Sequence, residues 1–168
     1  LKIGLAAPTG KATRRLQDAI QATIQSSNIQ DKGILSNIPC QTLHTWLQAR
    51  PNGFGKNKNS PLNLDLLVID EMSMVDLVLM QAILEALPKK SKLILVGDPN
   101  QLPPIGSGAV WQELHEQENH KNFREGTIHL SKIYRSRGDI AKLSITLKEN
   151  GASTFWNEIT SVGRSSNV

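Results

Sequence analysis

Short apolar runs alternate with longer amphipathic stretches along this 168-residue chain. The apolar runs are rich in Ile, Val and Leu and end at turn-forming or polar residues, as buried β-strands commonly do. Four such runs predict four strands, at Ile3–Ala7, Leu66–Ile69, Leu93–Val96 and, with a weaker pattern, Ile128–Tyr134.

Helical periodicity occupies the stretches between these strands. Lys11–Gln25 carries its apolar residues on one face, and Asp76–Leu87 is followed by Pro88, which stops a helix. Ser73 and Asp76 together resemble a capping box at the start of the second helix. Further helices are expected at Thr42–Ala49, Ser107–Gln117 and Asp139–Asn150, and a polar surface loop at Arg50–Asn63. Strands that alternate with helices predict an α/β fold, a mostly parallel sheet with helices on both faces.

Polar residues come after each predicted strand. Lys11 stands shortly after the first, Asp70-Glu71 directly after the second, Gly97 to Gln101 after the third, and Arg135 after the fourth. The carboxyl ends of parallel strands share one edge of the sheet, where doubly wound proteins bind ligands. Each group alone could be a turn or a helix cap, but four coincident cases predict a site.

The residues at this edge suit chemistry on a phosphoryl group. Asp70 could hold hydrated Mg²⁺ through water, and Glu71 could orient or deprotonate an attacking water. Gly97 permits a tight turn, and Asp98 could support the metal site. The Gln101 amide could touch both a terminal phosphate and the water near it. The guanidinium of Arg135 could offset charge on the transferring phosphate, although an ordinary surface arginine is also expected at such a position.

The segment Gly4–Thr13 has some features of a phosphate-binding loop but not its spacing. Five residues separate Gly4 from Gly10, and Ala12 follows Lys11 where a hydroxyl residue is required. Backbone N–H groups, the Thr9 hydroxyl and Lys11 at a helix N-terminus instead favour a nucleic-acid backbone phosphate, with Arg14 and Arg15 nearby. Thr42 is a plausible helix N-cap, and His44 is either a nucleic-acid contact or a satisfied polar residue.

The amino-acid composition argues against several classes of site and structure. Cys40 is the single cysteine, which excludes a disulfide framework and a multi-cysteine zinc site. Its simplest role is that of a small buried hydrophobe. A reducing cytoplasm is the compartment that this cysteine content fits. His115 and His120 lack further ligand types around them, and the three tryptophans are more often core residues than base-stacking ones. No apolar run approaches the roughly 20 residues of a membrane span.

Charge is segregated along the chain. Residues 1–60 carry eight Lys or Arg against two Asp or Glu, residues 61–120 three against nine, and residues 121–168 eight against four. Basic flanks around an acidic centre would serve a polyanion and a divalent metal, or simply form mixed solvated faces.

The ordered set of motifs resembles superfamily 1 DNA helicases of the RecD type. It consists of APTGKAT, TLHTWL, LDLLVIDEMSMVD, LILVGDPNQLPPIGSGAV and IYRS, within about residues 1–150. Within this group, the residues of the motifs are most similar to those of RecD, the alpha subunit of exodeoxyribonuclease V. The resemblance implies a RecA-like P-loop NTPase domain that uses ATP and Mg²⁺ and moves 5′ to 3′ on DNA, with RecB and RecC as partners of a true RecD.

The resemblance also implies roles for individual residues. Pro8, Thr9, Gly10 and Lys11 would grip single-stranded DNA, and Thr42 and His44 would extend that contact. Asp70 and Glu71 would be the Walker B pair, and Gln101 the sensor of the γ-phosphate. Gly97 and Asp98 would line the ATP site, and Arg135 would be an arginine finger, although Ser136 departs from the usual pattern there.

The Walker A loop of this family is expected upstream of Leu1. The chain is then an internal fragment, with a partial motor domain at residues 1–136 and a helical segment at 137–168 that leads towards a second motor domain. Because the phosphate-wrapping loop and its lysine are missing, these 168 residues alone are expected to hydrolyse ATP no faster than background. DNA-stimulated turnover by the isolated chain would contradict this expectation.

Two alternatives remain open from the sequence. A P-loop ATPase that is not a helicase, such as a PhoH-like protein, also carries a GD-x-x-Q segment, but APTGKAT and TLH argue against it. A non-catalytic nucleic-acid-binding scaffold would have kept the fold and lost turnover. The retention of Asp70, Glu71, Gln101 and Arg135 favours a working site.

Overall fold

The computed structural model describes residues 1–26, 32–106, 108–115 and 126–130. The chain divides into two compact units, residues 1–124 and 125–168. All of the strands and helices in the described ranges belong to the first unit. The predicted domain boundary after residue 136 and the predicted helix Asp139–Asn150 lie outside the described residues and stay predictions.

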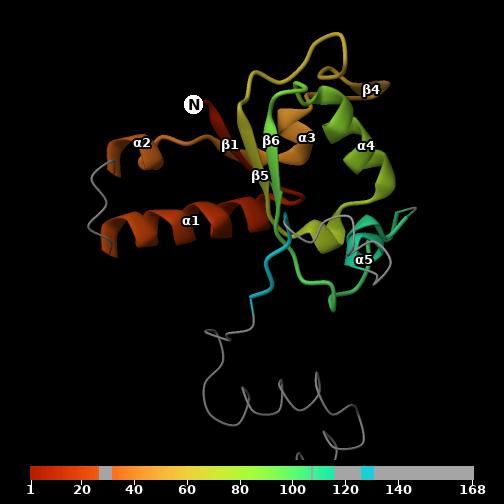
Figure 1. Cartoon of the computed structure of the whole chain (residues 1–168). Coiled ribbons are helices and arrows are strands. Elements are labelled where there is room, and N and C mark those ends of the chain that lie inside the picture. The colour runs from red at the N-terminus through yellow and green to blue at the C-terminus, as the bar shows by residue number, and fades with distance from the viewer. Residues whose placement is uncertain (27–31, 107, 116–125, 131–168) are drawn as a thin grey trace, which may run out of the picture. The chain divides into compact units, whose positions relative to one another are not determined.

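A four-stranded parallel sheet forms the centre of the first unit (Figure 1). Its order is β2-β1-β5-β6, and the strands are β1 Ile3–Ala7, β2 Cys40–Thr42, β5 Leu66–Ile69 and β6 Lys92–Leu95. Neighbours are hydrogen-bonded in register, with Leu5 opposite both Cys40 and Val68, and Val68 opposite Ile94. Three of the four predicted strands are confirmed to within one residue, and the fold class is confirmed.

The fourth predicted strand, Ile128–Tyr134, is not seen in its described part. Residues 128–130 carry no regular structure, and Ile128 and Leu130 are 85% and 82% exposed. An apolar run becomes a strand only when a neighbour satisfies its backbone groups, and no strand within the described ranges pairs with these three residues. The remainder of that run lies outside the described residues.

Helices cover both faces of the sheet (Figure 1). One face carries α1 Gly10–Ser26 and α2 Lys32–Ser36, and the other carries α3 Leu43–Trp46 and α4 Leu77–Ala86. A short 3₁₀ helix, η1 Met72–Met74, leads from β5 into α4, and α5 Val110–His115 packs against η1. None of the helices in the described part of the chain has both the length and the apolar character to cross a membrane.

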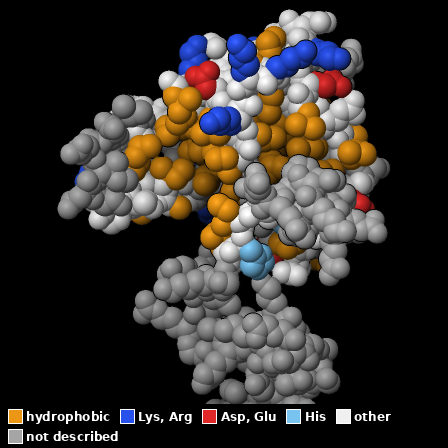
Figure 2. All heavy atoms as spheres, viewed as in Figure 1, with side chains coloured by type: hydrophobic (Ala, Val, Ile, Leu, Met, Phe, Trp, Pro, Cys, Tyr) orange, Lys and Arg blue, Asp and Glu red, His pale blue; other side chains and the backbone are white. Residues whose placement is uncertain are grey.

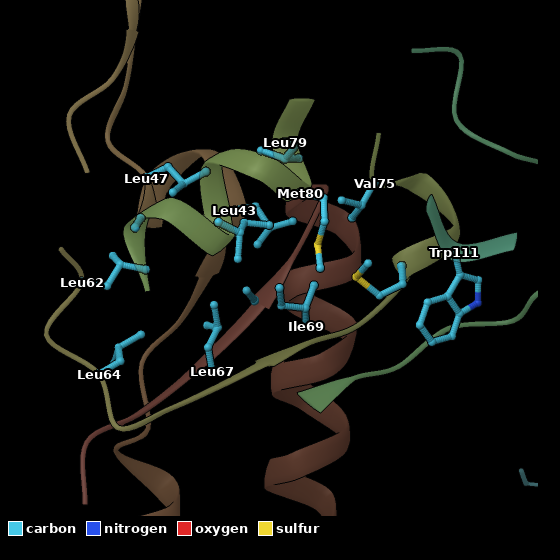
Figure 3. Packing of buried hydrophobic residues seen from close by; sticks show 14 residues of the cluster. Leu43, Leu47, Leu62, Leu64, Leu67, Ile69, Val75, Leu79, Met80 and Trp111 are labelled. Atoms are coloured by element: carbon cyan, nitrogen blue, oxygen red, sulfur yellow. The ribbon is translucent and has the colours of Figure 1, made fainter. Parts of the chain in front are cut away.

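The main hydrophobic core lies between the sheet and the helices α3 and α4 (Figure 3). Leu67 and Ile69 of β5 meet Leu43 of α3 and Ile83 of α4, all at most 1% exposed. Figure 3 shows Leu67 and Ile69 of the strand on the same side as Leu43 of α3. The alternation along β5 explains this, because every second side chain of a strand faces the same side.

A close approach at Gly4 joins α3 to the sheet. A Cβ atom there would lie 2.9 Å from both Trp46 Cζ2 and Leu64 Cδ1, so only glycine leaves room for the indole ring. The Trp46 indole Nε1 donates a hydrogen bond to the carbonyl of Leu5 at 2.9 Å. Trp46 is therefore a packing residue of the fold.

Two predicted segments between β2 and β5 need correction. The helix expected at Thr42–Ala49 ends at Trp46, because Ala49–Arg50 forms β3 of a small antiparallel hairpin with β4, Gly53–Phe54. The expected loop Arg50–Asn63 therefore contains part of this hairpin, and it also buries Leu62 to 4% exposure. Gly53, at φ 125°, supplies the turn conformation that other residues rarely adopt.

The predicted capping box before α4 is wrong in its assignment. Asp76, and not Ser73, is the N-cap, and its Oδ1 accepts a hydrogen bond from the Leu79 amide at 2.8 Å. Ser73 lies inside η1 and is fully buried. The N-cap therefore lies three residues after Ser73, because Ser73 belongs to a 3₁₀ turn that the spacing of polar residues did not indicate.

Replacement of Asp76 by Ala is expected to lower the free energy of unfolding by about 1 kcal/mol, since an amide at the start of α4 loses its acceptor. Asp76→Asn is the matched control, because asparagine caps as well as aspartate. Urea denaturation of the two variants beside the parent protein measures the difference. Equal destabilisation by both substitutions would show that the cap is not what Asp76 contributes.

Candidate functional site

The four parallel strands deliver the predicted site residues to one edge of the sheet. Thr42 ends β2, Pro8 follows β1, Asp70 follows β5, and Gly97 comes two residues after β6. The pairs Ala7 with Thr42, Ala6 with Ile69, and Ile69 with Leu95 hold these ends side by side. The expected gathering at the carboxyl edge is therefore present, except that Arg135 lies outside the described residues.

Two hydrogen bonds hold the acidic pair Asp70-Glu71 in place. The Asp70 amide donates to the Ala6 carbonyl at 2.9 Å, which continues the ladder between β1 and β5 one step past the strand. Its carboxylate Oδ1 accepts from the Glu71 amide at 2.8 Å. Oδ2 of Asp70 makes no recorded hydrogen bond to the described residues, so one hard oxygen remains for a cation or a water.

Glu71 adopts a left-handed backbone conformation, with φ 56° and ψ 44°. This conformation costs a residue with a side chain roughly 1–2 kcal/mol. Gln48, at φ 53°, is the other residue besides glycine with positive φ in the described part of the chain. Strain of this kind persists where the surrounding structure requires a particular direction of the chain, and functional sites are common places for it.

The segment after β6 is folded back on itself. Oδ1 of Asp98 accepts from the backbone amide of Asn100 at 2.9 Å and from its side-chain amide at 3.2 Å, so this carboxylate organises a turn. A turn follows Gly97, as expected, but Gly97 is not at positive φ, so the backbone conformation does not require glycine there. Glycine is needed because a Cβ atom would lie 3.0 Å from the Trp111 indole and from Met72 Cβ.

Gln101 is hydrogen-bonded to Ser73, a residue that the sequence indicated only as a helix cap. The buried Ser73 hydroxyl donates to Gln101 Oε1 at 3.2 Å, which links η1 to the loop after β6. The Met72 amide strengthens the same link by donating to the Val96 carbonyl at 3.0 Å. A serine next to two methionines gives no signal in the sequence that it will face a glutamine 28 positions away.

The first turn of α1 presents donors at the same edge. Thr9 Oγ1 accepts from the Ala12 amide at 3.2 Å and therefore caps the helix, while Lys11, Arg14 and Arg15 are exposed. The space where a side chain would stand on Gly10 is open, with no atom within 4 Å. This turn keeps its backbone and cationic groups accessible to an anion.

The second expected nucleic-acid segment lies on α3. Thr42 is the N-cap of that helix, as predicted, and accepts from the Thr45 amide at 3.2 Å. His44 is exposed, with its ring 6.3 Å from that of Phe54. A role of His44 in binding stays a prediction.

Cys40 and the histidines show no metal chemistry within the described ranges. Burial raises the pKa of the Cys40 thiol, whose Sγ donates to the Thr13 carbonyl at 3.4 Å. Cys40 is only partly buried and not the fully buried hydrophobe that was expected. No group of three or more His, Cys, Asp or Glu side chains suited to a metal occurs among the described residues. The His115 ring contacts the Trp111 indole, with ring centroids 4.4 Å apart and the two planes tilted by 56°. His120 lies in a part of the chain that is not described.

Lysines gather at the opposite, amino-terminal edge of the sheet. Lys2 precedes β1, Lys92 begins β6, and Lys89 and Lys90 stand in the turn before it. Figure 2 shows Lys and Arg side chains spaced along the top of the view, above a region of hydrophobic side chains. Lys89, Lys90 and Lys92 are the three basic residues of the acidic block 61–120, so the blocks of charge in the sequence do not correspond to edges of the sheet.

Comparison with known families agrees with this architecture. A sequence profile described as AAA domain matches residues 1–107, which include all four parallel strands and both motif-bearing loops. The chain belongs to the AAA domain family. In this AAA domain, Asp70-Glu71 and Gln101 both lie inside the matched stretch.

Curated relatives of this AAA domain are helicase subunits, which confirms the resemblance predicted from the motifs. It is 42% identical over 118 residues to the RecBCD enzyme subunit RecD of Mycolicibacterium smegmatis, covering 68% of this chain and 21% of that protein. It is 36% identical over 135 residues to the ATP-dependent RecD2 DNA helicase of Deinococcus radiodurans, covering 80% of this chain and 16% of that protein. The chain thus spans only about a fifth or less of their lengths.

Among solved structures, Bacteroides Pif1 bound to single-stranded DNA is similar to this AAA domain at a TM-score of 0.49 and 19% identity. The similarity covers 93% of this chain and 39% of the Pif1 chain.

Replacement of Glu71 by Gly is expected to raise the free energy of unfolding by about 1 kcal/mol, because glycine adopts the left-handed conformation without steric cost. Gln48→Gly should stabilise similarly, since Gln48 has the same backbone conformation. Glu71→Ala removes the side chain and keeps the strain, so it should not stabilise. Thermal and urea unfolding of the three variants test this, and a gain with Glu71→Ala equal to that with Gly would remove backbone strain as the cause.

Proposed function

We propose that this AAA domain is part of the ATP-driven motor of a DNA helicase of the RecD type. The observation that carries the proposal is the joint position of Asp70-Glu71 and Gln101 at one sheet edge, linked through Ser73. An acidic pair and a neutral donor on adjacent parallel strands are what phosphoryl transfer from a nucleotide requires. The similarity to RecD and RecD2 supports DNA as the second ligand.

The residues present fit the expected nucleotide and metal in part. The free oxygen of Asp70 is a hard ligand of the type that Mg²⁺ prefers, and the side-chain nitrogen of Gln101 is a donor for an anion. Mg²⁺ bound there would offset negative charge on the phosphates. The described residues contain no glycine-rich phosphate loop, so most of the binding energy for the nucleotide must come from elsewhere in the protein.

In the proposed reaction each residue has a separate task. Asp70 holds the metal through water, and Glu71 orients the attacking water and takes up its proton. Gln101 senses the terminal phosphate, with Gly97 and Asp98 shaping the loop that presents it. Arg135, if it reaches this edge, offsets charge on the phosphate as the bond breaks.

DNA would lie along the neighbouring strand ends. The first turn of α1, with Pro8, Thr9, Gly10 and Lys11, offers backbone amides and a cation to a backbone phosphate. Thr42 and His44 stand beside it because β2 pairs with β1. Contacts of this kind position a strand without selecting a sequence.

Assembly and location are proposed from the relatives. RecB and RecC would be partners if the whole protein is a RecD subunit, whereas a protein like RecD2 would act without them. A cytoplasmic protein that acts in DNA double-strand break repair is the corresponding setting.

Glu71→Gln in the whole protein is expected to lower ATP turnover at least about a hundredfold, because an amide cannot accept the proton of the attacking water. Nucleotide affinity should change little, since the substitution keeps size and removes one charge. Steady-state hydrolysis with single-stranded DNA and equilibrium binding of a fluorescent ATP analogue measure the two quantities. Equal loss of binding and turnover would contradict the role of Glu71.

Glu85→Gln on α4 is the matched control, since Glu85 is exposed and bonds only to Gln81 among the described residues. It should leave both quantities unchanged. A strand-displacement assay on duplex DNA with a single-stranded end separates a helicase from an ATPase of another kind. A protein that hydrolyses ATP without displacing a strand would exclude the helicase proposal, and one that binds DNA without any hydrolysis would indicate a scaffold.

A further inference from the structure

The Ser73 hydroxyl is a buried polar group with one hydrogen-bond partner among the described residues. Ser73 is 0% exposed and lies in η1, two residues after Glu71. Its Oγ donates to Gln101 Oε1 at 3.2 Å. Because a buried hydroxyl without an acceptor is costly, this contact fixes where the amide oxygen of Gln101 must be.

The contact also decides which end of the Gln101 amide is available. A side-chain amide has an accepting oxygen and a donating nitrogen. Since the oxygen faces the serine, the nitrogen is directed away from it, and no hydrogen bond from that nitrogen is recorded within the described ranges. Gln101 is itself exposed, so its nitrogen is accessible to a ligand at the sheet edge.

Two further bonds hold the backbone of Gln101. Its amide donates to the Asp98 carbonyl at 3.3 Å, and its carbonyl accepts from Gln112 Nε2 at 3.3 Å. The residue is thus held at three atoms, and only the Ser73 contact orients the side chain. The serine belongs to the loop that carries the acidic pair, so one hydroxyl couples the two loops.

We propose that Ser73 is a positioning residue that presents Gln101 as a hydrogen-bond donor to the terminal phosphate group of the nucleotide. This deepens the proposed function and rests on it. Ser73 does not touch the nucleotide, and it acts by holding the amide oxygen inward. Gln101 then donates to a phosphate oxygen, and it does not serve as the acceptor for the attacking water.

The test is a double-mutant cycle in the whole protein, with any partner subunits present. Ser73→Ala should lower kcat for ATP about fivefold and leave KM within about twofold, as expected when one neutral hydrogen bond stops orienting a group that acts after binding. Gln101→Ala should lower kcat on the order of a hundredfold. The double variant should match Gln101→Ala, because Ser73 has nothing left to orient.

A matched serine distinguishes this role from a general loss of packing. The Ser91 hydroxyl donates to the Leu64 carbonyl at the amino-terminal edge of the sheet, so Ser91→Ala should leave kcat unchanged. Effects of Ser73→Ala and Gln101→Ala that multiply in the double variant would overturn the proposal. If the parent protein does not hydrolyse ATP at all, the proposed function itself is contradicted. That result is distinct from one in which the parent protein is active and the Ser73 variant behaves otherwise than expected.

Gln101→Glu tests the donor role even if Ser73→Ala fails to fold. Glutamate keeps an oxygen acceptor for the serine but has no N–H to donate, so kcat should fall about as far as in Gln101→Ala. Activity near that of the parent in Gln101→Glu would show that Gln101 works as an acceptor, and it would overturn the proposal.

Discussion

The in-register parallel pairing of β1, β5 and β6 is the constraint on which the site depends. Leu5, Val68 and Ile94 lie in one row across the three strands, so the residues just past each strand end are brought level with one another. A slip of one residue in either pair would turn Leu67 and Ile69 out of the core, which makes the register costly to change. The apolar side chains therefore determine where the carboxylates and the amide stand, although they take no part in the chemistry.

Close packing next to the edge then limits how the loops can move. The Trp111 indole rests against Gly97, and the Met72 amide bonds to the Val96 carbonyl, so α5, η1 and the end of β6 support one another. The left-handed Glu71 is the point where the chain turns from β5 into η1. Burial of the Met72 side chain directly after it offsets strain at this residue. This arrangement combines a rigid support with an exposed glutamine.

Periodicity predicted the parts of the fold that bury regular faces. Helix α1, helix α4 and three strands arise from patterns within about fifteen residues, because burial repeats with the geometry of each element. Strand β2 was missed because Cys40–Thr42 is three residues long and has no apolar run. The placement of Asp70, Glu71 and Gln101 at one edge of the sheet could be predicted from the polar groups that follow each strand. The Ser73–Gln101 contact could not, since it depends on a 3₁₀ turn and a folded loop that leave no repeat in the sequence.

Strand β6 forms one end of the sheet that the structure describes, and Ile94 within it and Val96 just after it are 47% and 41% exposed. An apolar strand at an open edge offers its backbone amides and carbonyls as a template for another strand. Within the described ranges, β6 is therefore the place at which a further strand could extend the sheet by backbone hydrogen bonds.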